Sequence, residues 1–262
     1  MIVEESARLS CPTATNMPDA ALMTLIRAMV ATDRAVALSL LEANPALARA
    51  HFELGATRRT AKTYHMYEIG HYIYAGDTAL HVAAAAHQQE IVQKLIAAGA
   101  NVRARNRRGA EPLHYAADGM PGSHTWNPPA QAETVARLIE AGADPNATDK
   151  SGVTPLHRAV RTRCGAAVKA LLEAGADPRR RNKSGSTPML LATQSTGRGG
   201  IMRSESTTGV DRATASGAHQ QTNLIEAVYV NHYPKLHLRA RSTLSSIVDI
   251  ADIALRPFSA KE

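Results

Sequence analysis

Histidine is the side chain best suited to act as a general base or a metal ligand near neutral pH, and three histidines of this chain occupy matching positions. They end the phrases GDTALH, GAEPLH and GVTPLH, as His81, His114 and His157. Successive copies are 33 and 43 residues apart, so each copy belongs to its own unit of structure. This regular recurrence favours a structural role over catalysis or metal binding.

Three other motifs have residue types that could carry chemistry. His65, Glu68 and His71 form a loose H-x-x-E-x-x-H pattern, but the zinc signature H-E-x-x-H needs two histidines four residues apart on a helix. Cys164 has positive charge nearby that could lower the pKa of its thiol, although a short turn between helices is the simpler interpretation. GRGG at 197–200 lacks both the preceding strand and the following Lys-Ser/Thr of a phosphate-binding loop. We therefore expect no enzyme, no cofactor and no metal.

Basic residues give a stronger indication of binding. The net charge is +7, and most of the excess lies in residues 76–197. Two clusters and the segment between them hold the relevant residues: Arg103, Arg105, Arg107 and Arg108; Arg179, Arg180, Arg181 and Lys183; Arg158, Arg161 and Arg163. They could form a positive strip for a partner, or they could be solvated loop charges that hydrogen-bond to loop carbonyls. Both interpretations stay open.

Aromatic residues add candidate anchors for a partner. Four of the seven tyrosines, Tyr64, Tyr67, Tyr72 and Tyr74, lie in the segment TYHMYEIGHYIYAG, whose alternation predicts a β-hairpin. Trp126 is the only tryptophan, and tryptophan is enriched at binding hot spots. Trp126 could equally hold its own Pro-rich segment against the protein.

The elements that position these residues repeat along the chain. Phrases resembling GVTPLHRAV begin at Gly76, Gly109, Gly152 and Gly185, at intervals of 33, 43 and 33 residues. A second phrase, G-A-N or G-A-D, stays in phase with the first. The interval of 43 is explained by an insertion near 119–130, which is rich in Pro and Gly. A fixed period of this length predicts a repeat protein.

Each unit is predicted to contain two helices. In GVTPLHRAV the Thr154 hydroxyl caps free amide groups, and Pro155 occupies the first turn, where its missing N–H is not needed. The second helix, as in AAVKALLEAG, ends at a glycine suited to the left-handed conformation. The positions that carry the pattern are Thr78, Leu80, His81, Pro112, Leu113, His114, Thr154, Pro155, Leu156, His157, Thr187, Pro188, Gly99, Gly142 and Gly175.

In repeat length and in their recurring sequence motifs these units resemble ankyrin repeats. The resemblance implies an all-α solenoid of stacked helix-turn-helix units with β-hairpin finger loops, in which each unit buries the apolar face of its neighbour. It also implies that the repeated histidine hydrogen-bonds between neighbouring loops. In this family the finger loops and the first-helix faces form a concave surface that binds partners.

The repeat domain is expected to span residues 18–197, between an N-terminal tail (1–17) and a C-terminal segment. Its units are 18–75, a degenerate first repeat with a long finger; 76–108; 109–151, with the insertion; 152–184; and 185–197, a partial repeat in which Leu190 replaces the usual histidine. Residues 198–262 are expected to form a Ser/Thr/Gly-rich linker and tail with helices near 220–230 and 243–255, and a role as a cap stays open.

The remaining features point to a cytoplasmic protein. Glu4 and Glu5 stand where a secretory signal would be positively charged, and the most apolar stretch is interrupted by Arg27. Cys11 and Cys164 are too few for a disulfide framework. We expect a soluble monomer that does not enter a membrane.

Two functions remain open. The resemblance implies a non-catalytic protein–protein interaction module, whose partner would present an acidic surface to the finger loops and concave face. The alternative is a binder of anionic ligands or nucleic acid through the basic finger strip, and that binding would weaken steeply with salt.

Overall fold

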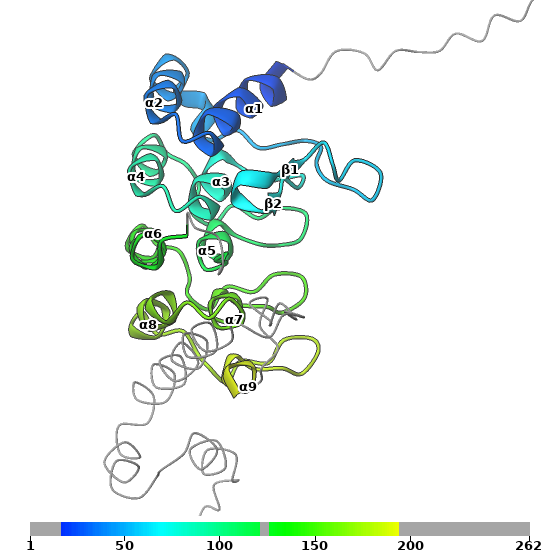
Figure 1. Ribbon diagram of the computed structural model, residues 1–262, viewed down its shortest axis with the longest axis vertical. Helices are drawn as coiled ribbons and strands as arrows, with labels where there is room; N and C mark the ends of the chain where they lie inside the picture. The colour runs from blue at the N-terminus through cyan, green and yellow to red at the C-terminus, as the bar shows by residue number, and fades with distance from the viewer. Residues whose placement is uncertain (1–16, 121–125, 194–262) are drawn as a thin grey trace, which may run out of the picture.

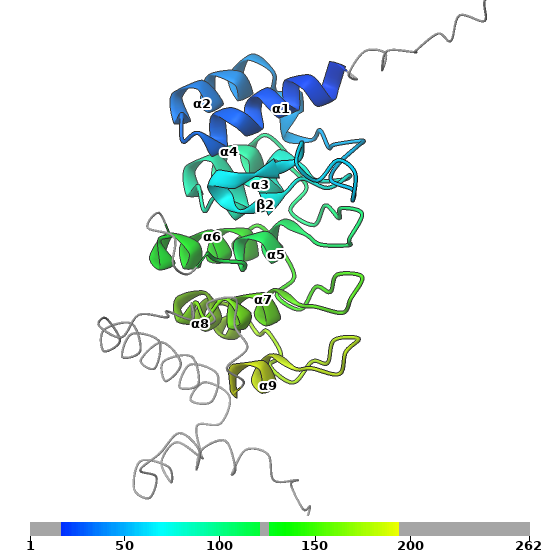
Figure 2. The same ribbon diagram turned by 45° about the vertical axis from the view of Figure 1, so that its right-hand side comes forward.

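The computed structural model describes residues 17–120 and 126–193, and in them the helices stack in two columns (Figure 1). One column contains α1 (Met17–Val30), α3 (Ala79–Ala85), α5 (Pro112–Ala116), α7 (Pro155–Arg161) and α9 (Pro188–Thr193). The other contains α2 (Arg34–Ala43), α4 (Gln89–Ala97), α6 (Pro128–Glu140) and α8 (Gly165–Glu173). The loops between successive repeats project to one side of the first column (Figure 2). The segments beginning at Gly109 and Gly152 lie next to each other, which confirms the predicted solenoid.

The first helix of a repeat begins as the sequence predicts. The Thr154 hydroxyl accepts a hydrogen bond from the backbone N–H of His157 at 3.3 Å, and Pro155 is the first residue of α7. At α9, where leucine replaces histidine, the Thr187 hydroxyl accepts from the Leu190 N–H at 3.0 Å. The cap therefore does not depend on the histidine.

The second helices bury side chains at positions i, i+1 and i+4. The buried sets are Ile91, Val92 and Leu95 in α4; Thr134, Val135 and Leu138 in α6; and Ala167, Val168 and Leu171 in α8. Glycines follow these helices at φ of +85°, +96° and +86°, at Gly99, Gly142 and Gly175. These left-handed values favour glycine and turn the chain into the next finger.

The N-terminal helix pair, α1 and α2, stacks on the next repeat, and its assignment as a degenerate first repeat stays a prediction. The Asp33 carboxylate caps α2 by accepting from the Val36 N–H at 3.2 Å. A short 3₁₀ helix, Pro45–Ala48, follows α2. Leucine, isoleucine and methionine side chains of α1 are fully buried in the core that continues into α3. The pair therefore closes one end of the stack.

The long finger that follows contains the predicted β-hairpin, which is short. Strands β1 (His65–Met66) and β2 (His71–Tyr72) are antiparallel and are joined by a 3₁₀ turn, Tyr67–Ile69. The turn ends at Gly70 with φ +60°.

The insertion near 119–130 is partly helical. Its last three residues belong to α6, which has 13 residues where α4 and α8 have 9. Proline at the first helical positions is compatible with a helix start, and the Asn127 side chain caps it by accepting from the Ala130 N–H at 3.1 Å.

The partial last repeat appears as α9, within the predicted range 185–197. The predicted N-terminal tail lies outside the described residues apart from Met17, which begins α1. The C-terminal linker and its two predicted helices also lie outside them. Among the described helices, none has the length and apolarity that crossing a bilayer requires.

Candidate binding surface: the finger loops

Each of the three finger loops after the first makes the same tight turn at its tip. The side-chain oxygen of Asn106 accepts hydrogen bonds from the backbone N–H groups two and four residues later, at 2.9 and 3.1 Å. Asp149 and Asn182 do the same in the next two fingers. A glycine at positive φ follows in every case. The residue after each Asn or Asp is therefore held at an equivalent position.

The backbone joins these tips in a row. The N–H of Arg107 donates to the carbonyl of Ala75 at 2.7 Å, and the N–H of Lys150 donates to Arg108 at 2.8 Å. The N–H of Lys183 donates to Ser151 at 2.9 Å. Because the main chain makes these bonds, they do not engage the side chains of Lys150 and Lys183, which are exposed, whereas the Arg107 side chain donates to the Ala56 carbonyl.

Some of the predicted strip arginines are neutralised by carboxylates. The guanidinium of Arg103 lies 3.4 Å from the Asp144 carboxylate, that of Arg105 lies 3.7 Å from Glu111, and that of Arg179 lies 3.7 Å from Asp177. Arg105 also donates to the carbonyls of its own and the next finger, as Arg181 does to the carbonyl of Gly185. In these contacts the arginines hydrogen-bond to loop carbonyls or pair with carboxylates, which is the second of the two interpretations that the sequence left open.

Four exposed cationic side chains at the tips are not neutralised by a carboxylate of the described residues: Arg107, Arg108, Lys150 and Lys183. We call these the fingertip cations. In residues 17–120 and 126–193 no carboxylate lies within ion-pair distance of any of them. The sequence analysis missed Lys150, although its place 43 residues after Arg107 and 33 before Lys183 gives it the same position in the repeat.

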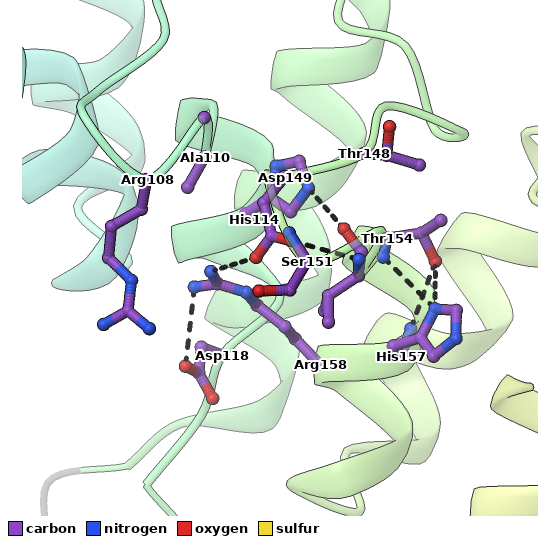
Figure 3. A network of polar contacts seen from close by, with 12 residues as sticks. Arg108, Ala110, His114, Asp118, Thr148, Asp149, Ser151, Thr154, His157 and Arg158 are labelled. Atoms are coloured by element: carbon purple, nitrogen blue, oxygen red, sulfur yellow. Dashed lines mark hydrogen bonds and ion pairs between the residues drawn. The ribbon is translucent and has the colours of Figure 1, made fainter. Parts of the chain in front are cut away.

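The arginines of α7 are arranged differently. Arg158 lies between two carboxylates, 3.7 Å from Asp118 and 3.4 Å from Asp149, and its side chain is only 13% exposed (Figure 3). Arg161 also contacts Asp118, at 3.3 Å. The predicted strip included both arginines as open charges, whereas the inner face here is a balanced network of two arginines and two aspartates. Arg163 lies in the turn after this helix, at φ +57°.

The hairpin of the first finger presents a cluster of rings. The His65 ring packs edge-on against Tyr67, with centroids 4.4 Å apart, and against Tyr72 at 4.5 Å. Tyr67 is the most exposed large apolar side chain of the described residues, at 69%, and Tyr72 is exposed at 40%. Tyr64, by contrast, is partly buried against the core.

The two histidines of the hairpin do not form a site together. His65 pairs with Tyr72 across the strands and Met66 pairs with His71, so the two imidazoles point to opposite faces. His71 instead stacks on Tyr115 of α5, with centroids 5.2 Å apart. In the described part of the chain, no group of three or more His, Cys, Asp or Glu side chains could hold a metal ion.

Tyr74 links the ring cluster to the fingertip cations. Its ring lies 6.4 Å from that of Tyr72, and the guanidinium groups of Arg107 and Arg108 lie 5.2 and 5.1 Å from its centroid. The Tyr74 hydroxyl also accepts from Arg108 at 2.9 Å. Rings and guanidinium groups therefore form one continuous surface from the hairpin to the second finger.

Asp77 is buried beneath this surface and anchors the finger to the next repeat. One carboxylate oxygen accepts from Asn106 at 2.8 Å, and the other accepts from the Tyr115 hydroxyl at 3.0 Å and the Tyr74 N–H at 2.6 Å. Burial raises the pKa of Asp77, and His81 and these hydrogen bonds oppose that shift. The network therefore positions Tyr74 and the Asn106 turn together.

Three family models match the chain along the part described above. Ankyrin repeats (3 copies) matches residues 50–124, Ankyrin repeat matches 108–150, and Ankyrin repeats (many copies) matches 138–192. The chain belongs to the ankyrin-repeat family. No curated protein matches it. Ankyrin repeats are generally protein–protein interaction modules, so a binding surface is the kind of site to expect.

The ankyrin histidines bridge neighbouring repeats, as the resemblance implied. Nδ1 of His81 accepts from the Thr78 N–H at 3.1 Å, so the protonated Nε2 donates to the Ala110 carbonyl at 3.1 Å. His114 and His157 repeat this arrangement toward the carbonyls of the following loops. Burial lowers the pKa of all three, that of His114 to about 3. They are neutral structural groups at pH 7.

Trp126 and Cys164 have structural surroundings in this ankyrin array. The Trp126 indole N–H donates to the Gln131 side chain at 2.8 Å, and its ring packs against the core, so it holds the insertion down. Cys164 is buried at the start of α8, and burial raises the pKa of its thiol, opposite to the lowering that nearby charge suggested.

Proposed function

We propose that this chain is a non-catalytic module that binds a partner protein through its finger loops and the concave face formed by the first helices. The observation that carries this proposal is the clustering of exposed apolar side chains around the first finger. Tyr67 and Tyr72 lie on the hairpin, and Met120 lies beside the hairpin turn, because a Cβ on Gly70 would meet the Met120 sulfur at 2.5 Å. Exposed apolar side chains gathered in one place are typical of interaction sites.

The inner face next to this cluster suits a partner with polar groups. Arg158 and Arg161 are already balanced by Asp118 and Asp149, so the face offers hydrogen-bonding groups and little net charge. Tyrosine at the edge of such a face supplies contact area at a small cost in side-chain entropy. We therefore place the apolar anchor of the interface at the hairpin and its polar part along α5 and α7.

The test is affinity capture of partners from the native host, comparing wild type with Tyr67→Asp and Met120→Asp. Val36→Asp is the matched control, because Val36 is also an exposed apolar residue, at 45%, but lies on α2 in the opposite column. We expect the control to retain the wild-type partner and both surface variants to lose it. A partner retained by all three variants would contradict this location of the interface.

A further inference from the structure

The fingertip cations have a geometry that ordinary loop charges lack. Backbone hydrogen bonds of 2.7–2.9 Å connect the tips of successive fingers, so Arg107, Lys150 and Lys183 emerge in register along one edge of the array. Their exposed side chains face no carboxylate within the described residues. A row of unneutralised cations in fixed register attracts a linear polyanion more than a compact anion.

The row begins at an aromatic surface. Arg107 and Arg108 lie over Tyr74, and the rings continue through Tyr72 and His65 to the exposed Tyr67. Cations that track a backbone, combined with rings on which bases stack, are the two components that proteins use to bind single-stranded nucleic acid. A duplex does not offer its base faces to such rings, and an acidic peptide does not require them.

We propose that the fingertip edge binds single-stranded nucleic acid, with phosphates on the fingertip cations and bases stacked on the exposed hairpin tyrosines. This function goes beyond the protein binding proposed above, because it requires the fingertip cations. The two share the hairpin tyrosines Tyr67 and Tyr72 but not Lys150 or Lys183, so one can fail while the other holds.

The experiment measures fluorescence anisotropy of labelled dT12 with the purified full chain over a range of salt concentrations. If the four fingertip cations each contact a phosphate, log Kd changes with log salt with a slope of about 3 in magnitude. Lys150→Glu combined with Lys183→Glu should lower the slope to about half of that and weaken binding about 10-fold or more in 50 mM salt. Neither side chain makes a hydrogen bond or ion pair in the described structure, so the double variant should fold normally.

The control is Lys94→Glu combined with Lys169→Glu, which changes the net charge equally but on α4 and α8 of the other column. It should bind dT12 within about 3-fold of wild type, because exposed charges beyond a Debye length are largely screened. Equal losses in both double variants would overturn the proposal, since binding would then depend on net charge alone. No binding of dT12 in 50 mM salt would overturn it as well.

One further variant and two alternative ligands decide the chemical class of the ligand. Tyr67→Ala should weaken dT12 binding about 5-fold or more, as expected for loss of a stacked base. A 12-base-pair duplex and a peptide of 12 glutamates should each bind more weakly than dT12. An unchanged Kd for Tyr67→Ala, or equal or tighter binding of the duplex or the peptide, would show that the edge does not select single strands.

Discussion

At the scale of single residues, three residues other than glycine adopt a left-handed backbone conformation just after the first helices of their repeats. Thr32, His87 and Arg163 have φ of 59°, 53° and 57°, a left-handed conformation that disfavours β-branched residues most. Each precedes the second helix of its repeat, at the turn between the two helices. The array therefore holds some backbone strain, and a glycine at one of these positions would relieve it.

Thr32→Gly should stabilise the protein, because glycine adopts this φ without the steric cost of a Cβ. We expect the free energy of unfolding to rise by about 0.5–1 kcal/mol, measured from urea denaturation. Ser39→Gly, at an exposed position inside α2, is the matched control and should lower it by about 0.5 kcal/mol. Equal effects of the two substitutions would mean that Thr32 is not strained.

The sequence predicted the roles of some residues and not those of others, for a physical reason. The Thr154 cap follows from local spacing and the histidine bridges follow from the resemblance to ankyrin repeats, and both are present. The burial of Arg158 between Asp118 and Asp149 depends on carboxylates from two different repeats, at separations no local pattern contains. Lys150 was not predicted, because a single lysine is recognised as part of a row only when its position is compared with the equivalent positions of the other repeats.

At the scale of elements, the fingers are built by one side chain each. Asn106, Asp149 and Asn182 close their turns with the same pair of backbone hydrogen bonds. Asn106 alone among these three also donates to the buried Asp77 carboxylate. The second finger is therefore tied more strongly to the core than the fourth.

Alanine substitution should reveal this difference. Asn182→Ala loses the turn bonds and should cost about 1 kcal/mol of unfolding free energy. Asn106→Ala loses the same bonds and leaves Asp77 and Tyr115 short of a partner in the interior, so we expect about 2–3 kcal/mol. Urea denaturation of the two variants side by side gives the comparison, and equal losses would argue against the Asp77 anchor.

Helix positions were predictable from the repeat period, whereas two features of the elements were not. The start of α6 at a Pro-Pro pair within the insertion does not follow from the period, although proline is compatible with a helix N-terminus. The stacking of the hairpin on α5, through His71 and Tyr115, joins segments whose proximity depends on tertiary packing. The repeat period predicts the order of the units, but it does not predict how an enlarged loop packs against them.

At the scale of the whole molecule, three buried histidines and the partly buried His87 make stability depend on pH. Burial lowers the pKa of His81, His114 and His157, and it lowers that of His87 to about 4. An unfolded chain takes up protons near pH 6.5, where these folded histidines do not. Their contribution is therefore complete above pH 6.5 and is lost as pH falls toward the folded pKa values, by up to about 1.4 kcal/mol per pH unit for each histidine.

His87→Asn should make this dependence shallower, because it removes one titrating group and asparagine tolerates the left-handed conformation. His87 faces His71 and Asp118 and donates to the Ala116 carbonyl at 3.2 Å, so the variant also loses one hydrogen bond at all pH values. We expect lower stability at pH 7.5 but a slope between pH 6.5 and 5 reduced by about 1 kcal/mol per unit. Urea midpoints at four pH values measure it, and an unchanged slope would contradict the role of His87.

The bonds between fingertips have a consequence for how this protein can change over time. Because the backbone N–H groups of Arg107, Lys150 and Lys183 make these bonds, the side chains of Lys150 and Lys183 can change without removing them. Mutations can thus change the charge and polarity of that edge one repeat at a time. The protein can then acquire a new ligand while its fold stays the same.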